Sequence, residues 1–214
     1  QQQPAHFQMI AWLVEWFCYR FADQIVMATT SDFEFALEVF PFTRRKKVAI
    51  QPNWVDEHLF KPFPREKFLE ADLVYIGRES AQKNLPALFD AVSKIGVSLD
   101  VYGSIKANKN LAGKHKRIRF MGPIKNSKIP QIMSRYKAFI LPSLFEGNPK
   151  VLLEAMSCGA KVIATAVPGI KDIIKHEYNG YLGQPDPCGI AEVITQALSS
   201  ERPVGVNARK DILK

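Results

Sequence analysis

Residues 139–159 read FILPSLFEGNPKVLLEAMSCG, and this stretch decides the class of fold. It opens with a short apolar run of the kind that forms a buried strand, and then passes through a polar loop into a helical pattern. We expect Asn148 to cap the helix, Pro149 to take its first position and Gly159 to end it. A buried strand followed by a loop and a helix is typical of the βα units of a parallel sheet.

The same alternation of β-rich runs and helical patterns continues in both directions along the chain. It predicts an α/β protein built on a Rossmann-like, doubly wound parallel sheet. The expected strands are residues 24–28, 48–50, 73–76, 97–102, 118–121, 138–141, 162–165 and 180–182. Helices are expected over 5–21, 31–40, 85–95, 127–136, 149–159 and 187–198, with Ser31, Asn84 and Ser127 as further N-caps.

These elements divide the chain into three parts. Residues 61–199 hold enough strands and crossover helices for one complete doubly wound domain. Residues 1–60 hold only two expected strands, so we interpret them as the remnant of a partial second α/β domain with its linker. Residues 200–214 are polar and poorly patterned, and we expect them to be a truncated tail.

Composition and charge narrow the possible partners. The 214 residues are 47% hydrophobic and 23% charged, which is typical of a folded domain. A formal charge of +8 favours anionic partners, and the basic residues cluster only at 43–47 (TRRKK) and at 106–119. Neither cluster is interleaved with aromatic residues as in a nucleic-acid platform. We therefore expect no nucleic-acid partner, and either peripheral contact with the inner face of a membrane or plain solubility.

The cysteines and the early apolar stretch bear on the compartment. Three scattered cysteines, Cys18, Cys158 and Cys188, form neither a metal-spaced pair nor a disulfide framework, so the cytosol is the expected compartment. The four histidines are equally scattered, and no zinc site is expected. The apolar residues 9–21 are too few to cross a bilayer and include charged side chains, so we expect a packed helix and no secretory signal.

The loop before the 149–159 helix is the stronger of two candidate ligand loops. Ligands of open parallel sheets bind outside the carboxyl ends of the strands, beside helix N-termini. Such an N-terminus offers N–H groups and a partial positive charge to a phosphate. Gly147 allows close approach of the backbone, and Lys150 adds a positive charge in the first turn, where the helix dipole favours an anion.

Two glutamates flank this predicted phosphate site. Glu154 lies five residues past Pro149, roughly 7–8 Å along the helix axis, which is about the distance from a pyrophosphate to the ribose of the same nucleotide. We interpret Glu154 as an acceptor for ribose hydroxyls, and Glu146 as a contact to a sugar on the other side of the phosphates. The alternative is that Lys150 and Glu154 form an ordinary i,i+4 pair on a solvated helix face.

The second candidate loop, residues 77–84, reads GRESAQKN. Arg78 offers a planar fork and Lys83 a point charge, a suitable pair for a diphosphate leaving group. The alternative is two exposed surface cations. The sequence contains no GxGxxG, no P-loop and no Asp-x-Asp pair. We therefore expect the two cations and helix N-termini to stabilise a diphosphate without a metal ion.

Several strings together resemble the retaining GT-B glycosyltransferases of the group that includes glycogen and sucrose synthases. They are GRESAQKN, LPSLFEGNPKVLLEAMSCGAKVIATAVPGI at 141–170 and NGYL at 179–182. Upstream, ADQIVMATTS and VAIQPNWVDEHLFKP resemble the inter-domain passage of that family. The resemblance covers roughly residues 22–198. It implies that residues 61–199 are the C-terminal, nucleotide-sugar-binding half of a GT-B fold.

The resemblance also implies a role for each matching position. Arg78 and Lys83 are expected to hold the donor diphosphate, Glu154 the ribose and Glu146 the donor sugar, with Glu146, Arg78 and Lys83 as the catalytic group. The other expected contacts are Gly147, Asn148, Pro149 and Lys150 along the sugar and phosphates, Ile124 at the base and Leu153 beside the ribose. The implied reaction transfers a hexose from a UDP-, GDP- or ADP-sugar to a glycan, lipid or polysaccharide, with retention of configuration and without a cofactor.

The chain also departs from the family pattern. Trp54 stands where the family usually has glycine, and Ala160 and Lys161 replace a small-residue–proline step. The family's acceptor domain is expected to precede Gln1, so the chain reads as a donor-binding fragment that needs this domain or a partner chain. A non-catalytic nucleotide-sugar-binding subunit and a GT-B-fold epimerase relative are the alternatives. Uncovered apolar surface on residues 1–50 then predicts a dimer or poor solubility.

Overall fold

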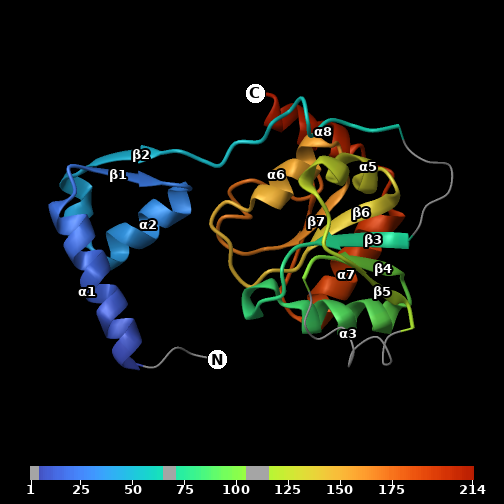
Figure 1. Ribbon diagram of the computed structural model, residues 1–214, viewed down its shortest axis with the longest axis horizontal. Coiled ribbons are helices and arrows are strands. Elements are labelled where there is room, and N and C mark those ends of the chain that lie inside the picture. The colour runs from blue at the N-terminus through green and yellow to red at the C-terminus, as the bar shows by residue number, and fades with distance from the viewer. Residues whose placement is uncertain (1–4, 65–70, 105–115) are drawn as a thin grey trace. The chain divides into compact units, whose positions relative to one another are not determined.

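The computed structural model describes residues 5–64, 71–104 and 116–214 of the chain, with side chains from residue 9 onward. Two compact units make up the protein, Gln1–Asn53 and Trp54–Lys214, and Figure 1 shows the elements of each. Most of the basic segment 106–119, predicted as a cluster, lies outside the described residues.

The first unit is a small α/β arrangement. Its elements are α1 (Ala5–Phe21), β1 (Gln24–Met27), α2 (Thr30–Val39), the 3-10 helix η1 (Pro41–Arg45) and β2 (Lys47–Ile50). The two strands pair in parallel, with Ile25 opposite Val48. Buried Ile25, Met27 and Ala36 form its core, so the unit buries few side chains.

The predicted cap of the second helix is wrong by two residues. Thr29, rather than Ser31, precedes α2 with an extended backbone, and its hydroxyl accepts a hydrogen bond of 3.0 Å from the Asp32 amide. The Asp32 carboxylate in turn accepts 3.1 Å from the Thr29 amide. This reciprocal pair is a capping box, and it starts the helix at Thr30 because it satisfies two backbone donors at once.

Helix α1 exposes much of its apolar surface. Eight large apolar side chains of this helix are exposed: Met9, Ile10, Trp12, Leu13, Val14, Trp16, Phe17 and Phe21. Among the helices within the described ranges, none combines the length and the apolar character that crossing a membrane requires. The first unit therefore presents apolar surface that its own residues do not cover.

The second unit is built on a six-stranded parallel sheet. Its strands are β3 (Ala71–Ile76), β4 (Leu99–Tyr102), β5 (Ile118–Gly122), β6 (Tyr136–Leu141), β7 (Val162–Thr165) and β8 (Tyr181–Gly183). They lie in the order β5-β4-β3-β6-β7-β8, and every neighbouring pair is parallel. Numbered along the chain, this order is 3-2-1-4-5-6, the arrangement of doubly wound dinucleotide-binding folds.

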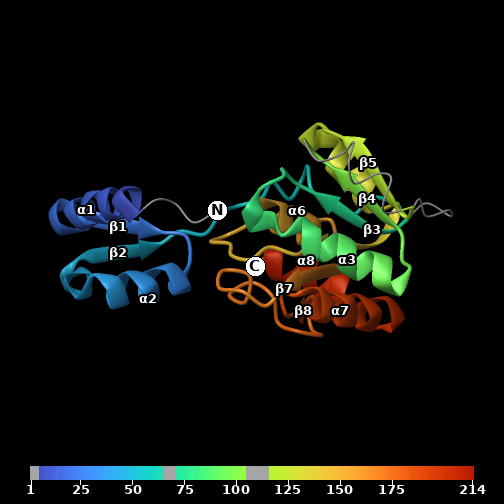
Figure 2. The same ribbon diagram turned by 90° about the horizontal axis from the view of Figure 1, so that it is seen from below.

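Helices cover both faces of this sheet (Figure 2). Helices α3 (Leu85–Ile95) and α7 (Pro187–Ser199) pack on one face, and α5 (Ile129–Met133), α6 (Lys150–Ser157) and α8 (Val204–Ile212) on the other. Two further 3-10 turns, η2 (Ala81–Lys83) and η3 (Asn126–Lys128), lead into α3 and α5. Each face has its own buried apolar cluster, so the doubly wound α/β fold predicted from the sequence is confirmed.

Three further predicted caps are wrong, because tertiary contacts and chain geometry decide these junctions. Asn84 precedes α3 in a left-handed conformation (φ 53°), but its side chain makes no cap hydrogen bond with the helix. Its side-chain Nδ2 donates instead to the carbonyl of Pro185, at 2.7 Å. Ser127 lies inside η3, and α5 begins two residues later without a side-chain cap. Asn148 does not cap α6, which begins at Lys150 after an extended Pro149.

Residues 200–214, expected to be an unpatterned tail, contain helix α8. Val204 and Ala208 of this helix are buried, and α8 packs beside α6. The Arg209 guanidinium donates to the carbonyls of Phe60 (3.2 Å) and Ser157. Val204, Ala208 and Ile212 follow a helical spacing, which the interpretation of this stretch as a polar tail overlooked.

Lys161 replaces the proline expected from the family pattern and has a structural role here. Its ammonium donates to the carbonyls of Ala197 (2.8 Å) and Ser200 (2.7 Å) at the C-terminal end of α7. The last carbonyls of a helix have no partner within the helix, and a lysine is a favourable cation at that end. Lys161 therefore ties the start of β7 to the end of α7.

Candidate functional site

The two candidate loops meet where the direction of the sheet changes. Strands β3 and β6 are neighbours, and the chain continues from β3 toward β4 on one side and from β6 toward β7 on the other. In open α/β sheets this switch point leaves a crevice outside the carboxyl ends of the two strands. The loops are in direct contact there, because the Leu144 amide donates 2.8 Å to the carbonyl of Gln82.

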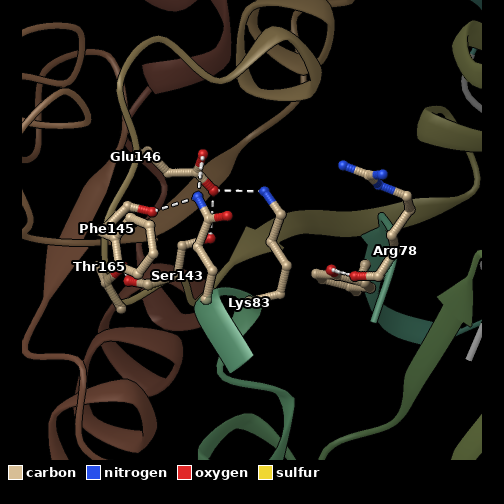
Figure 3. Close-up of polar contacts among 8 residues, drawn as sticks. Arg78, Lys83, Ser143, Phe145, Glu146 and Thr165 are labelled. Atoms are coloured by element: carbon tan, nitrogen blue, oxygen red, sulfur yellow. Dashed lines mark hydrogen bonds and ion pairs between the residues drawn. The ribbon is translucent and has the colours of Figure 1, made fainter. Parts of the chain in front are cut away.

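Glu146 is the centre of this contact (Figure 3). Its carboxylate lies 2.5 Å from the Lys83 ammonium and accepts hydrogen bonds from Ser143 Oγ (2.6 Å) and Gln82 Nε2 (3.2 Å). The Glu146 side chain is 8% exposed and that of Lys83 is 19% exposed. Two residues predicted to serve the donor sugar and the diphosphate therefore form a largely buried ion pair.

Backbone contacts hold the loop that carries Glu146. Gln82 also donates 2.8 Å to the carbonyl of Phe145, and the buried Thr165 hydroxyl of β7 donates to the carbonyl of buried Ser143. Sequence reasoning missed Gln82, Ser143 and Thr165. Local spacing could have suggested Ser143, because a serine three residues before a glutamate can form a short-range hydrogen bond. It could not have suggested Gln82, whose partners lie 63 and 64 positions away.

Gly169 is another residue of the site that sequence reasoning did not single out. Its φ is +77°, and a Cβ at this position would lie 2.0 Å from the carbonyl oxygen of Gly147 and 2.2 Å from that of Glu146. Real Cβ atoms do not approach so closely, so only glycine allows the 169 backbone to support the Glu146–Gly147 peptide.

Arg78 lies at the end of β3 and is exposed. Its carbonyl accepts a 3.0 Å hydrogen bond from the hydroxyl of buried Tyr75, whose pKa is raised by burial and further by the charge of Glu146. Within the described ranges, no ion pair involves the Arg78 guanidinium, and Figure 3 draws no contact from it to Lys83 or Glu146. The structure thus joins only two of the three predicted catalytic residues.

Helix α6, at whose N-terminus the sequence predicts a phosphate site, starts one residue later than expected. Lys150 takes the first helical position, and its exposed ammonium lies 5.5 Å from the centre of the Trp54 ring. This is the geometry of a cation–π contact. Trp54, which replaces the family's glycine, is 72% exposed, so it adds an aromatic surface beside the start of α6.

Glu154 lies inside the fold rather than on a solvated helix face. Only 7% of it is exposed, and burial raises its pKa, with Lys150 acting in the opposite direction. In the part of the chain that the structure describes, no side chain donates a hydrogen bond to its carboxylate. Of the other two predicted contacts, Leu153 is buried, and Ile124 is half-buried against the apolar cluster that contains Leu152 and Met156. A solvated Lys150–Glu154 pair is therefore not what the structure contains.

The described cavities lie away from this crevice. A groove of about 500 Å³ is found at the amino ends of β6 and β7, where Tyr136, Lys137, Cys158 and Lys161 are among its lining residues. Among the described residues, no group of three or more His, Cys, Asp or Glu side chains is placed to hold a metal ion. Charged residues from the two distant loops converge at the carboxyl ends of the neighbouring strands β3 and β6.

The strand order and the converging loops define the class: a doubly wound α/β protein whose two candidate ligand loops meet at the β3–β6 switch point. The family model of the glycosyl transferases group 1 matches residues 70–200, which include both loops. This chain belongs to the glycosyl transferases group 1 family.

Curated relatives agree with this assignment. An uncharacterized glycosyltransferase of Methanocaldococcus jannaschii is 29% identical over 157 residues, which cover 67% of this chain and 40% of that protein. An Escherichia coli UDP-Gal:alpha-D-GlcNAc-diphosphoundecaprenol alpha-1,3-galactosyltransferase is 28% identical over 161 residues, covering 64% of this chain and 41% of the relative. The chain thus spans about two fifths of the length of these relatives.

Solved structures show the same architecture. Sucrose-phosphate synthase from Thermosynechococcus elongatus matches with a TM-score of 0.85 at 23% identity, covering 100% of this chain and 59% of that one. Anabaena HepE in complex with UDP-glucose matches with a TM-score of 0.82 at 21% identity, covering 98% and 64%. The predicted GT-B architecture is thereby confirmed.

Proposed function

We propose that the crevice at β3 and β6 binds a nucleotide-sugar donor, and that the chain is the donor-binding part of a glycosyltransferase. The observation that carries this proposal is the convergence of Lys83, Glu146 and the N-terminus of α6 at the switch point of the sheet. Ligands of doubly wound folds bind at this place, and helix N-termini favour phosphates. Family membership supplies the reaction class, a transfer of a sugar.

In this proposal each part of the donor has its own partners. Lys83, Arg78 and the start of α6, with Gly147, Asn148, Pro149 and Lys150, serve the diphosphate and the sugar. Glu154 accepts hydrogen bonds from the ribose hydroxyls, which supply donors that its buried carboxylate does not receive from described side chains. Leu153 packs beside the ribose, Ile124 contacts the base and Glu146 contacts the transferred sugar.

We further propose that transfer retains the configuration of the sugar, needs no metal ion and uses a glycan, lipid or polysaccharide acceptor. The resemblance of the two loops to retaining enzymes supports the stereochemistry. Cations and helix N–H groups that face a diphosphate can stabilise a leaving group by charge alone. By its name, the Escherichia coli relative acts with UDP-Gal on a lipid-linked sugar, and HepE is crystallised with UDP-glucose, which supports a nucleotide sugar as the donor.

Calorimetric titration with UDP, GDP and ADP tests the donor site. We expect one of the three to bind, and Glu154→Ala and Arg78→Ala each to weaken that binding at least roughly tenfold. Glu192→Ala, which changes an exposed glutamate of α7, is the matched control and is expected to bind like the unaltered chain. Failure of all three nucleotides to bind would contradict the proposal, as would full affinity in Glu154→Ala.

A nucleotide-sugar-binding subunit that works with a partner chain is the second candidate. It is favoured by the small first unit, in whose described residues two strands pair, and by the 40–41% coverage of the relatives. A two-stranded sheet is marginal by itself. Adding the remaining portion of such a relative as a separate chain, with a lipid-linked sugar acceptor and a nucleotide sugar, should restore transfer if the partner supplies the acceptor site.

Peripheral contact with the cytoplasmic face of a membrane is also part of the proposal. The first unit combines the exposed apolar face of α1 with exposed Arg44, Arg45 and Lys47. Apolar area together with basic residues is the pattern of surfaces that bind anionic lipid. We expect the chain to float with vesicles that contain anionic lipid and less with neutral vesicles, and high salt to reduce the difference. Equal flotation with both would contradict an electrostatic contribution.

A further inference from the structure

The proposed function asks Lys83 and Glu146 to serve different parts of the donor, yet in the structure they bind each other. The Lys83 ammonium lies 2.5 Å from the Glu146 carboxylate, and both side chains are mostly buried, at 19% and 8% exposure. A lysine that turns toward a diphosphate therefore leaves behind a carboxylate that is shielded from water. Removing one member of a shielded ion pair costs far more than separating a pair on the surface.

The carboxylate is not able to follow the lysine, because its own loop holds it. Ser143 Oγ donates 2.6 Å to Glu146 Oε1, and Gln82 Nε2 donates 3.2 Å to Oε2. Ser143 is fully buried, and its carbonyl accepts a hydrogen bond from buried Thr165 of the next strand. Gly169 lies against the carbonyls of residues 146 and 147 and leaves no room behind them. Lys83, on a flexible four-carbon stem, is the mobile member of the pair.

The hydroxyl groups of a sugar are suitable replacements for the lysine at Glu146. A hydroxyl donates one hydrogen bond, so a donor sugar beside Glu146 compensates the carboxylate while Lys83 turns to the phosphates. A bare nucleoside diphosphate engages Lys83 but offers no hydroxyl at the position of the sugar. The same lysine movement is therefore compensated with the complete donor and uncompensated with the product.

We propose that the Lys83–Glu146 ion pair makes the site selective for a complete nucleotide sugar over the bare nucleoside diphosphate. The selectivity arises because only the sugar replaces Lys83 as the hydrogen-bond donor to Glu146. The inference rests on the proposed function, since it takes the crevice to be the donor site. Its consequence is that the nucleoside diphosphate, left after transfer, binds more weakly than the donor, and Lys83 returns to Glu146 as the product departs.

Calorimetry with UDP and UDP-glucose, and with the GDP- and ADP-based pairs, tests this inference. In the unaltered chain the nucleotide sugar is expected to bind roughly tenfold more tightly than its nucleoside diphosphate. Glu146→Gln releases Lys83 and keeps the shape of the side chain. This variant is expected to bind the nucleoside diphosphate roughly tenfold more tightly and to lose most of the preference for the sugar.

A double-mutant cycle separates this mechanism from simple repulsion between Glu146 and phosphate. In a Lys83→Gln background, Glu146→Gln is expected to change the affinity for the nucleoside diphosphate by less than about twofold, since no lysine remains to be released. An equal gain in both backgrounds would overturn the ion-pair mechanism. Glu192→Gln, an exposed glutamate of α7, is the matched control and should bind both ligands like the unaltered chain.

Ser143→Ala is a second variant, and it is expected to change the affinity for the nucleoside diphosphate in the opposite direction to Glu146→Gln. It removes a hydrogen bond from Glu146, so the carboxylate depends more on Lys83, and the nucleoside diphosphate is expected to bind several-fold more weakly. Unchanged affinity for the nucleoside diphosphate in Glu146→Gln, with both ligands still binding, would overturn the inference and leave the proposed function intact. Absence of binding of every nucleotide and nucleotide sugar to the unaltered chain would overturn both.

Discussion

Burial raises the pKa of Glu154 above its ordinary value, and the nearby Lys150 only partly opposes this effect. A carboxyl group whose pKa is raised in the folded state stabilises the fold below its unfolded pKa of about 4.3 and loses that contribution as the pH rises through the folded pKa. Ionisation of this carboxyl as the pH rises therefore lowers the stability of the fold. A residue kept under these conditions is a candidate for ligand binding.

Glu154→Gln is expected to raise the free energy of unfolding near pH 7, because the amide is neutral, and to weaken nucleotide binding, because it accepts hydrogen bonds less strongly than a carboxylate. The stability difference should shrink as the pH falls toward about 4, where the carboxyl of the unaltered chain is protonated. Urea unfolding across this pH range measures it. Lower stability of the variant at neutral pH would show that the charge of Glu154 is compensated in the fold.

Gly169 provides a sharper test of the geometry around Glu146. Gly169→Ala combines a left-handed backbone with a Cβ only 2.0 Å from the Gly147 carbonyl oxygen, so the loop that carries Glu146 must move. We expect a loss of about 1–3 kcal/mol in the free energy of unfolding together with weaker nucleotide binding. Urea unfolding and calorimetry on the same preparation measure the two effects.

Gly96→Ala is the matched control for that substitution. Gly96 ends α3 with φ +69°, close to the +77° of Gly169, but a Cβ there meets nothing within 4 Å. It carries the cost of a left-handed backbone, roughly 1 kcal/mol, without a collision and far from the crevice. Equal losses of nucleotide affinity in the two variants would mean that Gly169 does not position the loop.

At the scale of elements, α8 combines apolar packing with polar contacts from Arg209. The Arg209 guanidinium bonds the carbonyls of Phe60 and Ser157, and the Ser157 hydroxyl donates to the same Phe60 carbonyl at 2.5 Å. Arg209→Met keeps much of the stem but removes the donors. We expect it to lower the free energy of unfolding by about 1–3 kcal/mol, since hydrogen bonds from a charged group to buried carbonyls are lost.

Lys210→Met is the control for the helix itself, because Lys210 is the exposed neighbour of Arg209 on α8. Its effect should stay within about 0.5 kcal/mol, as for most surface substitutions. Urea unfolding followed by circular dichroism compares the two variants. Equal stability of both would show that the Arg209 contacts contribute nothing to the packing of α8 on α6.

The elements divide sharply into those that the sequence predicts and those that it does not. Helix α3 spans the predicted residues 85–95, and β7 the predicted 162–165, because both carry apolar patterns with clear ends. Predicted caps are wrong where a distant contact decides the junction. The Asn84 side chain, for example, donates to the carbonyl of Pro185, 101 positions away. Helix α8 was missed because its stretch is polar overall, although Val204, Ala208 and Ile212 are spaced as on one face of a helix.

The candidate site also contains features that local sequence patterns predict and features that depend on distant contacts. The sequence predicts Lys83 and Glu146 as members of one site from their loops, and the structure brings them together. It does not predict that they bind each other, nor that Gln82 and Ser143 complete the arrangement. These contacts depend on how two loops, 63 positions apart, meet in space, which no local pattern contains.

On the scale of the whole molecule, the two units differ in how well they cover their apolar residues. The second unit encloses two large apolar clusters, whereas α1 of the first unit is exposed along much of its length. Exposed apolar patches promote association. We expect the chain to form dimers or larger species as its concentration rises, in light scattering coupled to gel filtration.

Replacing Leu13 and Phe17 of α1 by glutamine should shift this equilibrium toward the monomer, because both side chains are at least half exposed, at 50% and 60%. Val206→Gln is the matched control, since Val206 is 70% exposed on α8 of the second unit. A monomer at every accessible concentration of the unaltered chain would contradict the prediction, as would an equal shift in the control variant.

The long separation between Lys83 and Glu146 also sets when the crevice first exists. The loop with Lys83 leaves the ribosome well before β6, Glu146 and the supporting Gly169 have been synthesised. At about 5–20 residues per second the delay amounts to several seconds. During this time β3 lacks its central neighbour, and the proposed donor site is not yet assembled. In the proposed function, donor binding is therefore acquired late in biosynthesis, once β6, the loop of Glu146, β7 and Gly169 have joined β3.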